Sequence, residues 1–145
     1  MKKKTLKILA AGFTAILSLQ TGFALYTLSK LKKIKGNYKT SVIQNDKKIS
    51  LTGQEFSGDS LLIAFGAYEL DLRGAIPTSQ FISLTIKAMY SGVKIIVPEG
   101  WSVKGEGKTF LGGFTNKCKV GQEGLPHLII QYDISFAGVE VINGN

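Results

Sequence analysis

The sequence predicts an all-β fold, and a recurring six-residue phrase is the first reason. The phrase stands at 65–70 (FGAYEL), 90–95 (YSGVKI) and 136–141 (FAGVEV), with a looser copy at 110–115 (FLGGFT). Each full copy joins an aromatic residue, two small residues and an apolar–charged–apolar run, which fits a tight turn followed by a half-buried strand. Self-similarity at intervals in the twenties is typical of stacked β architectures.

Alternation of apolar and polar residues is the second reason. Residues 82–87 and 93–97 alternate, and no stretch from Ile49 onward has a helical period long enough to compete. The clearest period of two runs through 128–136, where one face carries Leu128, Ile130, Tyr132, Ile134 and Phe136. Such patterning predicts half-buried strands.

Residues 1–28 are expected to form a basic tail and one transmembrane helix. No charged side chain lies between Ile8 and Leu28, and about 20 apolar helical residues cross a bilayer. A cleaved signal peptide is the alternative, but this stretch exceeds the usual ~7–15-residue apolar region. The lysines that follow it also resist export. We therefore expect membrane lipid to surround residues 8–28 as an uncleaved anchor.

Residues 29–48 are expected to form a basic juxtamembrane linker, and residues 49–145 the β domain. Nine lysines and no acid lie in residues 1–40, so the net charge of +8 leaves −1 for residues 41–145. A nucleic-acid binder needs positive charge on its folded surface, so this class is excluded. Cys118 is the only cysteine, which gives no disulfide and favours the cytoplasmic side.

Two architectures fit the β domain: a short right-handed solenoid, in which each coil stacks on the previous one, or a sandwich. The recurring unit favours the solenoid, because stacking buries equivalent apolar positions in register. Fewer than five coils are expected. The small residues of the phrase are expected to form the turns; the glycines among them are Gly66, Gly92, Gly112, Gly113 and Gly138.

No motif predicts catalysis, a cofactor or a metal site, so an enzyme is not expected. Residues 105–109 (GEGKT) resemble the end of a phosphate-binding loop but lack its first glycine, and a hairpin turn is the better interpretation. His127 has no second ligand at metal-binding spacing. Glu69 and Asp71 fit a solvated strand face. Lys117 and Lys119 could lower the pKa of the Cys118 thiol, although a passive cysteine is the default.

A turn at Pro98, Glu99 and Trp101 is the candidate partner contact. Tryptophan often anchors protein interfaces. The alternative is that the indole closes a small core, which needs large apolar groups.

The segment 92–103 (GVKIIVPEGWSV) resembles the G-V-x-I-x-V-P-x-x-W-x-V signature of the C-terminal domain of LiaF-like proteins, also called cell-wall-active antibiotic response proteins. The flanks 69–72 (ELDL), 110–114 and 128–141 agree with it, and the likeness covers about residues 58–143. Alanine stands at Ala67 and Ala137 where glycine is usual, and one span replaces several. The resemblance implies a β-rich domain on the bacterial cell membrane that regulates a sensor histidine kinase, commonly as a negative regulator.

The expected function is therefore a membrane-anchored, non-enzymatic interaction domain in envelope-stress signalling. The partner would be a sensor histidine kinase, bound through an exposed strand edge or the Trp101 turn. The alternative is a membrane-tethered structural module that assembles into homo-oligomers through its β domain. A lipid or ligand binder is a third possibility and would need an apolar groove.

Overall fold

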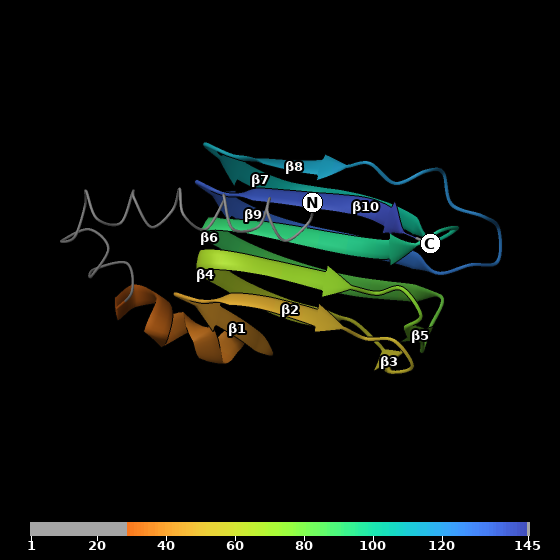
Figure 1. Ribbon diagram of the computed structural model, residues 1–145. Coiled ribbons are helices and arrows are strands. Elements are labelled where there is room, and N and C mark those ends of the chain that lie inside the picture. The colour runs from red at the N-terminus through yellow and green to blue at the C-terminus, as the bar shows by residue number, and fades with distance from the viewer. Residues whose placement is uncertain (1–28, 145) are drawn as a thin grey trace.

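The computed structural model describes residues 29–144, and the expected membrane span at 8–28 lies outside them (Figure 1). Residues 29–34 are helical and lead into the 3-10 turn η1 (Lys35–Asn37). The strands follow as β1 (Thr40–Ile43), β2 (Asp46–Ser50), β3 (Glu55–Phe56), β4 (Asp59–Asp71), β5 (Ile76–Pro77), β6 (Phe81–Pro98), β7 (Ser102–Phe110), β8 (Gly113–Asn116), β9 (His127–Ser135) and β10 (Gly138–Gly144).

The strands stack as the coils of a solenoid. Every strand pairing within residues 29–144 is parallel, whereas a sandwich built from hairpins would be antiparallel. The long strands β4 and β6 turn a corner and contribute to two faces. One face has the order β1-β4-β6-β9-β7, and the other has the order β2-β4-β6-β10-β8. The all-β, solenoid-like expectation is confirmed at this level.

The domain begins earlier than residue 49. The expected linker 29–48 instead supplies the helix at 29–34, strand β1 and the start of β2. The residues 40–43 and 46–50 form a first coil that pairs with β4. This coil was not predicted from the sequence because its composition is polar. An end coil can be polar, since it has only one neighbour to pack against. The described residues therefore hold five coils, where fewer than five were expected.

The coils do not stack in chain order. The coil β9–β10 lies between β6 and the coil β7–β8, as Figure 1 shows. Composition explains this exchange. The register pairs Gly105 with Ile130 and Gly107 with Tyr132, so the apolar coil takes the position covered on both sides. The coil with glycine and charge takes the end, where one side meets solvent.

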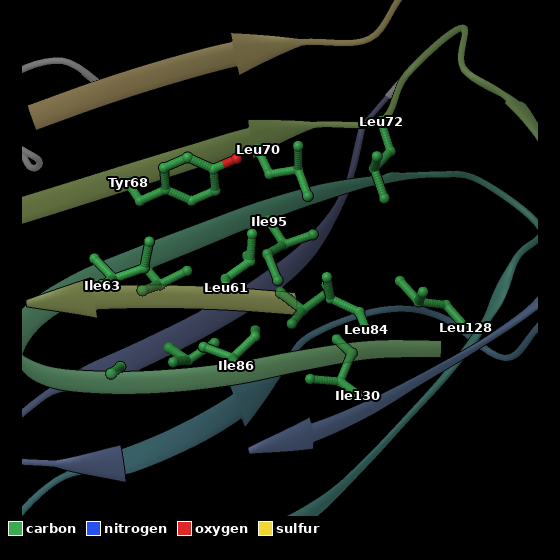
Figure 2. Packing of buried hydrophobic residues seen from close by; sticks show 14 of the residues in the cluster. Leu61, Ile63, Tyr68, Leu70, Leu72, Leu84, Ile86, Ile95, Leu128 and Ile130 are labelled. Carbon is green, nitrogen blue, oxygen red and sulfur yellow. The ribbon is translucent and has the colours of Figure 1, made fainter. Parts of the chain in front are cut away.

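The core lies between the two faces. Strands β4, β6 and β9 send alternate side chains inward, and Figure 2 shows those of Leu61, Tyr68, Leu84, Ile95 and Ile130 turned toward one another. Each of these residues is at most 2 % exposed. Burial of one such side chain contributes about 1.5–3 kcal/mol. The expected inward face of 128–136 is confirmed for Leu128, Ile130 and Ile134, while Tyr132 is half-buried.

Each coil turns its corner at a residue in the left-handed backbone region, and that residue is not glycine. The five corner residues, with φ between 47° and 57°, are Gln44, Phe65, Tyr90, Leu111 and Phe136. The strand registers place them in one row along the stack. The prediction that the small residues make the turn is therefore corrected: the residue before them does.

The glycines of the phrase have a different role. A Cβ at Gly66 would collide with the carbonyl oxygen of Asn45, and one at Gly112 with that of Ala137. Gly113 and Gly138 have open space around them, and Gly92 is buried. The looser copy is also offset by one residue, because Leu111, and not Phe110, pairs in register with Phe136.

Among residues 29–144, no helix has the length and apolar character needed to cross a bilayer.

Candidate interaction surfaces

The corner row carries a stack of aromatic rings. The ring of Phe65 lies parallel to that of Tyr90, with centroids 5.2 Å apart, and Tyr90 lies parallel to Phe136 at 4.9 Å. Phe110 meets Phe136 edge-on at 5.5 Å. A non-glycine residue in the left-handed region costs about 1–2 kcal/mol, and an aromatic pair contributes about 0.5–1.5 kcal/mol beyond its burial. Stacking thus offsets much of the backbone strain at the corner.

The N-terminal helix covers part of this corner. Leu31, which is 1 % exposed, belongs to a second apolar cluster with Leu62, Ala64, Phe65 and Tyr90. Ile34 and Tyr38 pack against the same cluster. Leu62 and Ala64 lie on the outward side of β4, so the helix supplies the cover that makes two apolar outward residues stable there. The helix is amphipathic, since Lys30, Lys32, Lys33 and Lys35 are all exposed.

The corner continues beyond the helix as an exposed apolar surface. Phe110 is 61 % exposed and Leu111 is 66 % exposed, at the turn between β7 and β8. In Figure 1 this turn and the helix lie on the same side of the solenoid but at opposite ends of the stack, while the 117–126 loop lies on the other side. Two large apolar side chains side by side on a corner are typical of a docking surface.

A second surface is the outer edge of β7. Within residues 29–144, β7 pairs only with β9. The amide of Ser102 donates to Pro126, and the carbonyl of Phe110 accepts from Phe136. Because hydrogen-bonding direction alternates along a strand, the even-numbered residues bond to β9 and the odd-numbered ones face away. The carbonyl of Val103 accepts from the Asn116 amide at 2.9 Å, which leaves Gly105, Gly107 and Thr109 along the outward edge.

Close packing fixes the two glycines of this edge. A Cβ at Gly105 would collide with the ring of Phe114, and one at Gly107 with the carbonyl of Tyr132. Phe114 itself stacks on Tyr132, with centroids 4.6 Å apart. The Phe114 ring therefore closes the end of the core, and the edge of β7 stays open beside it. The hairpin turn expected at 105–109 is wrong, because these residues lie inside strand β7.

Charges alternate in sign across the coils. Lys48, Glu69, Lys94 and Glu140 lie in one register row. The pairs Lys48–Glu69 (3.0 Å) and Lys94–Glu140 (3.8 Å) join neighbours in this row. On the other face Lys87 bonds to Asp133 at 2.9 Å. Opposite charges on adjacent strands favour the observed order of coils and disfavour slips in register.

The solvated strand face expected for Glu69 and Asp71 is wrong for Glu69, which is buried. Glu69 is only 7 % exposed and bonds to Lys48. The guanidinium of Arg73 donates hydrogen bonds to both carboxylate oxygens of Asp71, and the shortest is 2.7 Å long. Hydrogen bonding to Asp71 raises the pKa of Arg73. Each carboxylate therefore has its own cation.

The opposite end of the stack carries a charge at a core position. Lys47 is in register with Tyr68, whose side chain lies in the core. Lys47 is exposed because no further coil covers it in residues 29–144. An inward-pointing lysine on an end coil opposes the addition of another strand, since stacking would bury its ammonium group.

The structure places Trp101 inside the core. Trp101 is 4 % exposed and belongs to the main apolar cluster. This favours the alternative in which the indole closes the core over the one in which it contacts a partner. Pro98 is half-buried and Glu99 is exposed at the same turn. The turn is held by a bond from the Trp101 amide to the Pro98 carbonyl (3.4 Å) and by Gln122, whose amide donates to the Gly100 carbonyl (2.8 Å).

A shallow groove of about 340 Å³ lies on the outer face of β6, β9 and β7. Most of its lining residues are polar or charged, although the surface that they turn into the groove is mainly apolar; they are Tyr38, Thr85, Ile86, Lys87, Glu106, Gly107, Lys108, Gln131, Tyr132 and Asp133. A lipid or ligand binder needs an apolar groove, and this alternative stays a prediction.

The remaining candidates for chemistry are passive. Burial raises the pKa of the Cys118 thiol, which favours the passive, half-buried cysteine over one activated by Lys117 and Lys119. His127 stacks on Phe81, with ring centroids 4.9 Å apart. In the part of the chain that the structure describes, no group of three histidine, cysteine or acidic residues is placed to hold a metal ion.

Comparison with known proteins gives no relative. No protein-family model matches the sequence, and no curated protein or solved structure is significantly similar to it.

Proposed function

We propose that this chain is a membrane-anchored, non-enzymatic interaction protein whose β domain binds a partner by strand addition at β7. The observation that carries the proposal is the outward edge of this nine-residue strand, where Gly105, Gly107 and Thr109 face away from β9. In strand addition, main-chain hydrogen bonds supply affinity and alternate side chains supply specificity.

The charges of β7 indicate what kind of strand would fit. Lys104, Glu106 and Lys108 are exposed on the outer face of β7. Since the charge rows of this domain alternate in sign from coil to coil, an added strand with acidic, basic and acidic residues at alternate positions would extend the pattern. Opposite-charge pairs across strands contribute roughly 0.2–1 kcal/mol each.

The resemblance of residues 92–103 to the LiaF-like motif supports a regulatory role for the chain and a kinase as its partner. By that resemblance the chain acts as an accessory or negative regulator in bacterial envelope-stress signalling, and a sensor histidine kinase is the partner. The apolar sequence at 8–28 supports a single-pass anchor in the cell membrane. The lone cysteine favours a cytoplasmic β domain.

Two proline substitutions test the edge in the full-length chain. Thr109→Pro removes an amide on the outward edge and is expected to abolish partner binding without unfolding the domain, because edge strands tolerate proline there. Lys108→Pro removes an amide that faces β9 and is expected to unfold the domain. Thr109→Val is the control that keeps the amide.

A membrane two-hybrid screen against the histidine kinases of the same cell gives the readout, with protease resistance as the test of folding. Loss of a kinase interaction in folded Thr109→Pro supports the edge as the site. Retained binding in that variant rejects the edge, and no interaction with any kinase for the unaltered chain rejects the kinase as the partner.

A membrane-tethered module that assembles end to end is the second candidate. Open edges at both ends of the stack favour it, since β1, β2, β7 and β8 each have one strand partner within residues 29–144. Lys47 opposes it, because head-to-tail stacking would bury this charge. We therefore place self-assembly below partner binding.

A further inference from the structure

We infer that the side of the solenoid that carries the corner row lies against an anionic lipid surface, with Phe110 and Leu111 in the interface and the lysines of residues 30–35 above the headgroups. This inference rests on the proposed membrane anchor. It adds an orientation: the axis of the stack runs along the membrane plane, because the corner row extends along the stack.

The connection between the proposed anchor and the domain is short. The apolar stretch ends at Leu28, and Leu31, three residues later, is buried against the corner residues Phe65 and Tyr90. Three residues span at most about 10 Å. Each headgroup layer is about 5–8 Å thick. A domain attached by so short a connection stays close to the bilayer. The side of the domain that faces the bilayer is the side that carries the corner row.

The corner side of the solenoid carries both basic and exposed apolar side chains. Lys30, Lys32, Lys33 and Lys35 are exposed on the helix, within a Debye length of about 8–10 Å from the headgroups. Lysines near a membrane surface attract anionic lipids. Leu111 is exposed on the same row of corners, and Phe110, the residue before it, is exposed beside it. Apolar side chains beside a basic helix are typical of interfacial membrane contacts.

A tryptophan placed at the corner tests the contact. Leu111→Trp fits the backbone, because Phe65, Tyr90 and Phe136 hold aromatic side chains at equivalent left-handed positions. The full-length variant is reconstituted into vesicles of phosphatidylcholine and phosphatidylglycerol with brominated acyl chains, which quench tryptophan at short range. Val120→Trp is the matched control, since Val120 is 95 % exposed and belongs to the 117–126 loop. That loop lies on the side of the solenoid away from the corner row (Figure 1). Native Trp101 is buried and adds a constant background.

We expect quenching several-fold stronger at Leu111→Trp than at Val120→Trp. We also expect it to weaken in vesicles of phosphatidylcholine alone, and when Lys32 and Lys33 are changed to Gln. Equal quenching at the two sites, or none at Leu111→Trp, overturns the inference. A blue-shifted but unquenched Leu111→Trp also overturns it, because a protein such as a second copy then covers the corner.

Flotation of the vesicles separates this inference from the anchor on which it rests. Protein that floats with the vesicles after an alkaline wash, but shows no quenching at Leu111→Trp, keeps the anchor and loses the contact. Protein that no longer floats rejects the anchor, and the inference falls with it.

Discussion

The ring of Phe136 lies parallel to that of Tyr90 with the two centroids 4.9 Å apart, although three strands, β7, β8 and β9, come between them in the chain. This contact exists because β9 and β10 enter the stack next to β6 and displace β7 and β8 to its end. It joins the aromatic corner to the unusual order of coils. Both features can be tested separately.

The aromatic stack is expected to stabilise the corner. Tyr90 lies at its centre, between Phe65 and Phe136, and is 7 % exposed. Truncation of Tyr90→Ala removes both ring contacts and should lower the free energy of unfolding by about 3–5 kcal/mol. Tyr90→Phe keeps the stack and should cost much less. Urea unfolding of the full chain in detergent measures both, and similar losses for the two variants would show that the stack itself contributes little.

The order of coils makes the C-terminal coil essential for the one before it. Removal of residues 127–145 takes away the only strands that pair with β7 and β8 in the described structure. The amides of 102–116 should then lose their protection from hydrogen exchange, while those of 59–71 keep theirs through β1 and β2. If the coils stacked in chain order, β7 would pair with β6 and stay protected after the truncation.

Alkaline pH is expected to destabilise the domain through Tyr68. Burial, with a smaller contribution from Asp59, raises the pKa of Tyr68 from 10.0 to about 12. The neutral phenol is favoured in the folded state, so its contribution is complete below about pH 10 and is lost as the pH rises toward 12. Two pH units correspond to about 2–3 kcal/mol.

Tyr68→Phe should reduce this alkaline loss without abolishing it, because burial also raises the pKa of Tyr90. Unfolding free energies at about pH 9 and pH 11.5 give the comparison. An equal alkaline loss in the unaltered chain and in Tyr68→Phe would assign the effect to other groups.

Lys47 is expected to keep the stack from growing. Lys47→Leu places an apolar side chain at a core position of the open end coil, in register with Tyr68, and should promote head-to-tail association. Analytical ultracentrifugation of the full chain in detergent should detect larger species in this variant. Lys47→Arg keeps the charge and should match the unaltered chain. Growth of the unaltered chain to the same extent would instead favour the self-assembling module.

The membrane side of the domain can be read from a thiol at Val120. Cys118 is half-buried and its pKa is raised by burial, so it reacts slowly with labels. Val120→Cys in a Cys118→Ala chain offers a fully accessible thiol two positions away. If the domain is cytoplasmic as proposed, an impermeant maleimide should label this thiol only after lysis. Labelling in intact cells would place the domain outside and redirect the search for partners to the envelope.

The sequence by itself determined the β character of the domain and most of its strands. Alternation at 82–87, 93–97 and 128–136 predicted β6 and β9, because residues with one buried face leave a period of two. The first coil escaped prediction, since Lys47 and Lys48 stand at an end where little is buried. The candidate partner contact at Trp101 also could not be separated from a core position, because an indole serves both equally well.

Only the tertiary structure decided the parallel pairing, the order of the coils, and which residue turns each corner. Repeats of similar composition can stack in several orders, and the choice depends on which coil loses least by standing at an end. Left-handed backbone at Phe65 and Tyr90 is unfavourable locally. It is stable here because rings from neighbouring coils stack across it, and that contact exists only in the assembled fold.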